Sequence, residues 1–228
     1  MAKDSNYESF KTLKDSMKVS IESSQNVIPL LHIVLPMSSK RVFSDVFKGF
    51  TNIKPIYVDD QVVDKYDCWV LKMEALKIHF LSTHQGRNVV YVELDMIFKK
   101  CMVNYIESVF KNDFDLCLTY KSYPDSAGSM NTGVILYKNV DQRIINFERV
   151  CLKRSEQAKC AGGLNQNTYD KMGLKSIPYY NKLRIHGIIV MSIPMGVINN
   201  TNFKKHDDNT CIYHFKGGRK KEMLTFES

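Results

Sequence analysis

The stretch Asn88-Val89-Val90-Tyr91-Val92-Glu93-Leu94-Asp95 gives the strongest buried-strand signal in the sequence. Its continuous apolar run, Val89–Val92, is typical of a strand that is covered on both faces. Side chains alternate along a strand, so Glu93 and Asp95, two positions apart, are predicted to point the same way. We therefore expect two neighbouring carboxylates at the carboxyl end of a buried strand, where open α/β sheets bind ligands.

These two carboxylates indicate a candidate metal site. Two acids side by side repel each other unless a cation lies between them, and oxygen ligands favour Mg²⁺ or Mn²⁺. Such a cation also neutralises a diphosphate as it leaves. An acid-x-acid triplet is common at the start of an ordinary loop, so the metal interpretation depends on support from other segments.

The segments around this strand predict an α/β architecture. Apolar runs indicate further strands at 27–35, 53–58, 115–120 and 134–137, with two or three short ones in 175–198. Helical spacing or composition indicates helices at 38–47, 69–86, 102–109, 141–153 and 165–172. Because strands and helices alternate in the first half, we expect an α/β/α sandwich with a mostly parallel central sheet and a smaller mixed extension.

The composition is that of one ordinary globular domain. The chain has 228 residues, of which 44% are hydrophobic, enough for a sizeable core. A net charge of +8 favours anionic ligands such as nucleotides. Residues 1–25 form a polar lead-in without a secretory signal, no apolar run is long enough to span a membrane, and the six cysteines form no CxxC pair. We expect a cytoplasmic protein with free thiols.

Four ordered segments resemble the GT-A glycosyltransferases, which are nucleotide-diphospho-sugar transferases that include the glycogenin and galactosyltransferase-like group. Residues 89–98 resemble the family strand that ends in Asp-x-Asp, with Glu93 in place of the first Asp. Residues 69–72 resemble the helix that carries a basic residue toward the donor. Residues 130–137 resemble the strand that borders the sugar pocket, and 212–217 resemble the His-Phe-x-Gly ending.

The resemblance implies a fold, a division of the chain and a metal centre. It implies a single GT-A domain over 1–228, with a nucleotide-binding half at 27–120 and a sugar- and acceptor-binding half at 121–221. Mn²⁺ or Mg²⁺ is expected to bind Glu93, Asp95 and His214, with Asp95 as the firmer ligand.

The resemblance and the strand ends also suggest which residues contact the substrates. Donor and nucleotide contacts are expected from Pro36, Asp59, Lys72, Arg87, Glu93, Asn131, Lys216, Gly217, Arg219 and Lys220. The candidate catalytic residues are Asp95, Gln166 and Asp125. Gln166 follows Asn165 where the family often has Asp-Gln, and Asp125 and Asp170 are candidate bases for an inverting reaction. The His-Phe-x-Gly ending favours a retaining reaction instead.

Two other functions stay open at this point. A sugar-phosphate nucleotidyltransferase shares the sheet and the acids, but its glycine-rich loop is missing from residues 36–41. A non-catalytic basic module for nucleic acid or anionic glycan needs basic and aromatic stripes, which the sequence does not show clearly. We expect no nucleic acid partner, but a nucleotide-sugar donor and a glycan, protein or small-molecule acceptor. A zinc site at His206, Cys211 and His214 lacks a fourth ligand.

Overall fold

The computed structural model describes residues 14–120, 130–157, 168–169, 172, 174, 177–201, 208–215 and 220–226. Its strands are β1 (Leu31–Pro36), β2 (Ile53–Val58), β3 (Val89–Val92), β4 (Met96–Phe98), β5 (Leu116–Tyr120), β6 (Met130–Tyr137), β7 (Lys182–Ile185), β8 (Ile188–Pro194) and β9 (Ile212–His214). Its named helices are η1 (Met37–Ser39), α2 (Lys40–Phe43), η2 (Asp60–Val62), α3 (Trp69–Thr83), α4 (Val103–Phe110), α5 (Gln142–Gln157) and α7 (Lys220–Met223).

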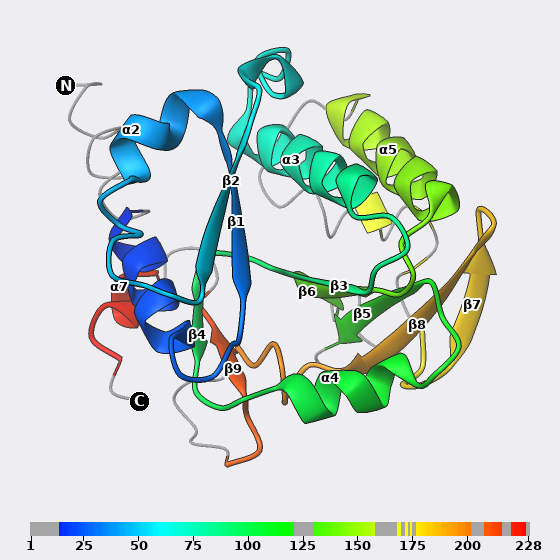
Figure 1. Cartoon of the computed structure of the whole chain (residues 1–228). Coiled ribbons are helices and arrows are strands. Elements are labelled where there is room, and N and C mark those ends of the chain that lie inside the picture. The colour runs from blue at the N-terminus through cyan, green and yellow to red at the C-terminus, as the bar shows by residue number, and fades with distance from the viewer. Residues whose placement is uncertain are drawn as a thin grey trace.

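A five-stranded sheet in the order β3-β6-β5-β8-β7 forms the centre of the molecule. Helices α3 and α5 lie side by side over one face, and α4 covers the other (Figure 1). The alternation of β5 shows why: Leu116 and Leu118 belong to the core under α3 and α5, whereas Cys117 packs with Ile106 of α4. The predicted α/β sandwich is therefore confirmed. Its inner strands have continuous apolar sequences because both of their faces are covered by helices.

The strand directions differ from the expectation of a mostly parallel sheet. Among the described ladders, parallel pairing occurs in β1–β2 and β5–β8, whereas β6 runs antiparallel to both of its neighbours. Parallel neighbours need a crossover of a dozen or more residues, and fewer residues than that, 121–129, separate β5 from β6 in the sequence. The hairpin between β7 and β8 turns through His186 and Gly187, both at positive φ, as a two-residue hairpin turn requires.

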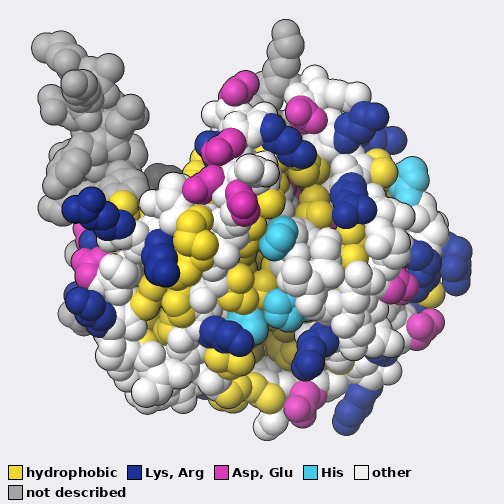
Figure 2. Space-filling view, turned by 45° about the horizontal axis from the view of Figure 1, so that its top comes forward, with side chains coloured by type: hydrophobic (Ala, Val, Ile, Leu, Met, Phe, Trp, Pro, Cys, Tyr) yellow, Lys and Arg dark blue, Asp and Glu magenta, His cyan; other side chains and the backbone are white. Residues whose placement is uncertain are grey.

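Strands β1 and β2 form a separate two-stranded sheet, and an apolar cleft of about 590 Å³ lies between β1 and β3. Side chains of α3 and α4 complete its walls. On the α3 side, His84 stacks on Phe80 at 3.9 Å between ring centroids, and His32 meets Phe80 edge-on. Figure 2 shows hydrophobic side chains beside histidines near the middle of one face. The cleft therefore separates the two-stranded sheet β1–β2 from the five-stranded central sheet.

The lead-in that the sequence describes as polar contributes to the core. Residues 14–24 are helical, and Met17 and Ile21 are each only 1% exposed. They pack with Ile33 and Leu35 of β1 and with Phe43 of α2. The apolar positions are four apart, which matches one face of a helix, and the surrounding polar residues hide this pattern in the composition.

A buried ionic cluster joins the helices α3 and α5 to strand β6. Lys77 Nζ lies 2.6 Å from Glu74 and 3.0 Å from Glu148, and the three side chains are at most 4% exposed. Tyr137 and Tyr169 donate hydrogen bonds to Glu148. Burial lowers the pKa of Lys77, but the two carboxylates outweigh it and raise the pKa well above its usual value. Lys77 is therefore a buried cation.

Two further features of the structure concern the cysteines and the length of the apolar helices. The cysteines that the structure describes, Cys68, Cys101, Cys117, Cys151 and Cys211, are all free. Among the described helices, none combines the length and the apolar character that a membrane crossing needs.

Candidate metal centre

Glu93 and Asp95 lie in the connection between β3 and β4, because the strand ends at Val92. The prediction that strand alternation aligns them was therefore wrong. Backbone hydrogen bonds position this connection instead: Glu93 N donates to the carbonyl of Gly133 in β6, and Phe215 N donates to the carbonyl of Asp95. The two acids are held from both sides by segments far away in the sequence.

The antiparallel pairing of β4 with β9 brings His214 to these acids. Met96, which follows Asp95, is the register partner of His214. A strand of three residues has a weak sequence signal, so β9 was not predicted from the sequence. The pairing explains how the predicted ligand set is assembled from two distant parts of the chain.

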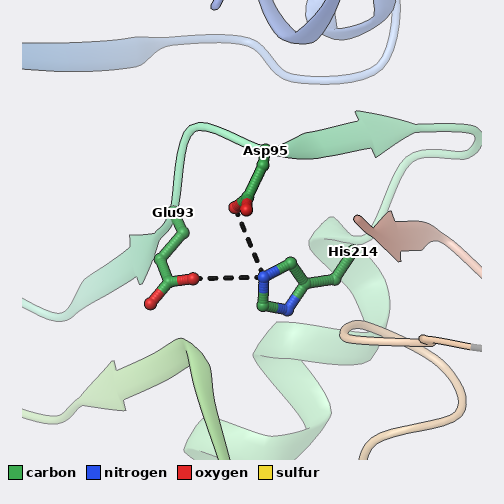
Figure 3. A group of neighbouring side chains, drawn as sticks. All are labelled: Glu93, Asp95 and His214. Carbon is green, nitrogen blue, oxygen red and sulfur yellow. Dashed lines mark ion pairs between the residues drawn. The ribbon is translucent and has the colours of Figure 1, made fainter. Parts of the chain in front are cut away.

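The three predicted metal ligands converge (Figure 3). His214 Nε2 lies 3.1 Å from Glu93 Oε2 and 3.3 Å from Asp95 Oδ1. One ligand atom from each residue lies within 4.8 Å of the others, and no other group of this kind exists among the described residues. His214 is fully buried and the Asp95 side chain nearly so, whereas the Glu93 side chain is 22% exposed. The cluster is thus open on the Glu93 side.

The electrostatics of the cluster fit a cation. Burial lowers the pKa of His214, but the contacts with Asp95 and Glu93 outweigh it and raise the pKa above 6.5. His214 Nε2 is buried yet makes no hydrogen bond, although both carboxylates are near it. Two carboxylate oxygens and one imidazole nitrogen are suitable ligands for a divalent ion such as Mn²⁺. The three ligand atoms at this site therefore fit a divalent metal ion.

The opposite side of the His214 ring contacts two asparagines. Its Nδ1 lies 2.9 Å from Oδ1 of Asn199 and 3.4 Å from Nδ2 of Asn131. Asn199 is fully buried, and its Nδ2 donates to Thr119 Oγ1 at 2.5 Å. Asn199 and Thr119 were not predicted from the sequence, because neither belongs to a recognisable motif and only the tertiary fold brings them to the histidine.

Residues predicted to contact the nucleotide follow the ends of β1 and β2. Pro36 ends β1, and Asp59 follows β2, where its side chain accepts a hydrogen bond from Gln61 N. The neighbouring Asp60 accepts hydrogen bonds from both the backbone N and the hydroxyl of Ser38. This pairing ties the two strand ends together, and the nucleotide contacts themselves stay predictions.

The other described donor candidates lie at different places. Lys72 is half-buried in the first turn of α3. Arg87 is exposed and precedes β3, so the whole strand separates it from Glu93. Asn131 is buried, with Oδ1 accepting from Gly133 N and Nδ2 facing His214. Asn131 therefore reaches the centre through the histidine, and its predicted contact with a sugar hydroxyl stays a prediction.

Several predicted site residues lie outside the described part of the chain. They are Asp125, Gln166, Lys216, Gly217 and Arg219, together with the alternative base Asp170 and the zinc candidate His206. Lys220 begins α7, but its side chain also lies outside the description. Their roles stay as predicted from the sequence.

Comparisons with known proteins were made for sequence and for structure. No known family model matches the sequence, and no curated protein matches it either. Three solved structures are similar over most of this chain. Mouse xyloside xylosyltransferase 1 has a TM-score of 0.58 and 12% identity, covering 90% of this chain and 92% of its own. Galactosyltransferase LgtC, solved with donor and acceptor sugar analogues, has a TM-score of 0.54 and 14% identity, covering 93% and 91%. Glycosyltransferase GlyE of Streptococcus pneumoniae TIGR4 has a TM-score of 0.60 and 11% identity, covering 97% and 59%.

These likenesses extend over nearly the whole described architecture rather than one motif. The chain therefore has the GT-A fold found in these glycosyltransferases, as the sequence resemblance predicted. At identities this low the comparison supports the fold, and the function has to be argued from the site.

Proposed function

We propose that the chain is a metal-dependent glycosyltransferase, which transfers a sugar from a UDP- or GDP-linked donor to an acceptor hydroxyl. The observation that carries the proposal is the convergence of Glu93, Asp95 and His214 beyond the carboxyl end of β3, within a GT-A fold. A fold alone hosts many functions, but two carboxylates and an imidazole nitrogen that converge beyond the end of β3 make a specific chemical arrangement.

The residues of the chain divide the work of such a transfer. Glu93, Asp95 and His214 would hold Mn²⁺ or Mg²⁺, which neutralises charge on the leaving diphosphate when it is bound. The exposed side of Glu93 leaves one face of the centre accessible to a donor. Lys216, Gly217 and Arg219, which follow His214 in the sequence, are proposed to contact the diphosphate and exclude water. Residues 27–120 are proposed to bind the nucleotide, and residues 121–221 the sugar and the acceptor.

The face of the molecule in Figure 2 gives no support for a basic binding module. On the face shown in Figure 2, Lys and Arg side chains are scattered among acidic ones and form no continuous stripe. A nucleic-acid-binding face requires clustered positive charge. The net charge of +8 is thus compatible with an enzyme that binds an anionic donor.

Thermal unfolding with combinations of nucleotide and metal tests the proposal. UDP or GDP together with Mn²⁺ is expected to raise the Tm more than either component alone, because ligands that bind only the folded state stabilise it. Asp95→Asn should abolish the joint shift. Asp45→Asn is the matched control, since Asp45 is exposed and pairs with Lys14 away from the centre.

The competing functions predict different results. A salt-sensitive shift with an oligonucleotide alone would favour the basic module. Release of pyrophosphate from UTP and a sugar phosphate would favour a nucleotidyltransferase. Release of UDP or GDP from a panel of nucleotide sugars in the presence of acceptors should identify the donor, and no joint shift with any nucleotide would refute the proposal.

A further inference from the structure

The buried contacts behind His214 determine which way Asn199 is oriented. The Asn199 Nδ2 lies 3.2 Å from the backbone carbonyl of Asn131, an oxygen that can only accept. The same Nδ2 donates to Thr119 Oγ1, whose own proton is used in a hydrogen bond to that carbonyl. A flipped amide would place Oδ1 against these acceptors. Asn199 therefore presents its Oδ1 to His214.

Asn131 is oriented in the same way by a backbone group. Its Oδ1 accepts a hydrogen bond from Gly133 N at 3.0 Å, and this N–H can only donate. Its Nδ2 therefore faces His214 Nδ1, as the contact at 3.4 Å shows. The imidazole Nδ1 thus lies between an acceptor at 2.9 Å and a donor at 3.4 Å. A proton on Nδ1 satisfies the shorter contact, which is the stronger hydrogen bond.

We propose that Asn199 is a positioning residue that holds the proton of His214 on Nδ1, so that Nε2 presents a lone pair to the metal between Glu93 and Asp95. This inference rests on the proposed metal centre and adds a residue to it. In neutral imidazole only one nitrogen carries a proton. A hydrogen bond that fixes the proton on one nitrogen leaves the other nitrogen free to bind the metal. With the proton on Nε2, the same ring presents an N–H where a ligand atom is needed.

Two substitutions at position 199 separate this role from simple packing. Asn199→Leu removes the acceptor and the donor together. Asn199→Asp keeps an oxygen for Nδ1–H but loses the Nδ2 donor to Thr119 and Asn131. Both changes lower the free energy of unfolding of the metal-free protein, because a buried hydrogen bond is lost in each.

The measurement is Mn²⁺ affinity of the full chain, from the electron paramagnetic resonance signal of free Mn²⁺. Asn199→Leu is expected to weaken Mn²⁺ binding roughly 10- to 100-fold, the usual effect of losing a hydrogen bond behind a metal-ligating histidine. Asn199→Asp should bind Mn²⁺ at least as tightly as the unchanged protein. The matched control is Asn52→Leu, which removes a buried amide bonded to Ser24 and Ile28 far from the centre. It should leave Mn²⁺ affinity unchanged.

A second measurement applies even if Asn199→Leu does not fold. In the unchanged, metal-free protein, at a pH where the His214 ring is neutral, ¹⁵N–¹H spectra should show a protonated, exchange-protected Nδ1 and an unprotonated Nε2 for His214, assigned with His214→Asn. A proton on Nε2, or equal Mn²⁺ affinities for folded Asn199→Leu and the unchanged protein, would overturn the inference while leaving the glycosyltransferase proposal in place. If the unchanged protein binds no divalent ion, the metal centre fails and both proposals fail with it.

Discussion

The imidazole ring of His214 lies directly over Gly133, so closely that a Cβ at position 133 would be 2.4 Å from the ring Cε1 and 2.5 Å from Nδ1. Non-bonded contacts this short are essentially never found for a Cβ atom, so one of the two groups has to move if any other residue replaces the glycine. Asn131-Thr132-Gly133 is an Asn-x-Gly sequence of the kind that is common in turns. In the structure it lies in strand β6, and its glycine leaves space for the proposed metal ligand His214.

Gly133→Ala is expected to displace the His214 ring and weaken Mn²⁺ binding at least tenfold. The inserted methyl should also lower the free energy of unfolding by about 1–3 kcal/mol, the usual range for overpacking a filled interior. Isothermal titration with Mn²⁺ and urea unfolding measure the two effects. Gly196→Ala is the control, because a Cβ there has no atom within 4 Å. Unchanged Mn²⁺ affinity in Gly133→Ala would show that the ring adjusts freely.

The raised pKa of His214 makes the stability of the metal-free protein depend on pH. A group with a higher pKa in the folded state stabilises the fold below its unfolded pKa, and this contribution is lost as the pH rises through the folded pKa. The free energy of unfolding should therefore decrease as the pH rises above about 6.5. His214 contributes at most about 1.4 kcal/mol per pH unit to this decrease. Urea titrations over pH 5.5–9 measure the slope.

Substitution and metal each test that assignment. His214→Asn should flatten the slope in the same pH range. Since protons and metal compete for Nε2, Mn²⁺ should bind more tightly as the pH rises over that range. A slope that is the same in His214→Asn would assign the pH dependence to other groups.

Removal of the buried cation in the ionic cluster is expected to be far more damaging than removal of a surface one. Lys77→Met leaves Glu74 and Glu148 buried without their cation, which should cost about 3–5 kcal/mol of unfolding free energy. The double variant Lys77→Met/Glu148→Gln should recover part of this loss, because one of the unpaired charges is gone. Lys18→Met, which disrupts only an exposed pair with Glu22, should change the free energy by less than about 1 kcal/mol. Similar losses in both single variants would contradict the burial of Lys77.

The cysteines should differ sharply in reactivity. Cys101 is exposed, whereas burial raises the pKa of Cys117 and Cys151. Because the thiolate is the reactive form, iodoacetamide at neutral pH should modify Cys101 before Cys117 and Cys151, and reach the two buried thiols only after unfolding. Peptide mass spectrometry of the peptides that carry Cys101, Cys117 and Cys151 at increasing times measures the order. Rapid modification of Cys117 in the folded protein would be inconsistent with its position under α4.

Periodicity was sufficient to predict the main elements of the fold. The continuous runs of β1 and β5 depend on burial of the strands, and this leaves a direct trace in the sequence. Helical spacing also predicted α3, but its apolar positions Trp69, Met73, Leu76 and Phe80 line the cleft, and Trp69 is 42% exposed. Strand direction leaves no such trace, since β6 reads the same whether it runs parallel or antiparallel. The same limit applies to the separation of β1 from β3, which depends on how α3 and α4 pack.

The candidate site shows the same division between local and tertiary information. Glu93, Asp95 and His214 were predictable because they resemble a known order of motifs. The mechanism of alignment was predicted incorrectly, because backbone hydrogen bonds with Gly133 and Phe215, rather than strand pleating, position the acids. Asn199 was not predictable, since only the bridge between Asn200 and Tyr213 brings it beside the histidine.

The pairing of β4 with β9 has a consequence for how the protein matures during synthesis. Residues 212–215 are fully buried, and this segment supplies both the proposed ligand His214 and the backbone N–H that holds Asp95. A nascent chain that ends after β8 lacks these groups, so the proposed metal centre can be complete only after residue 215 has been synthesised.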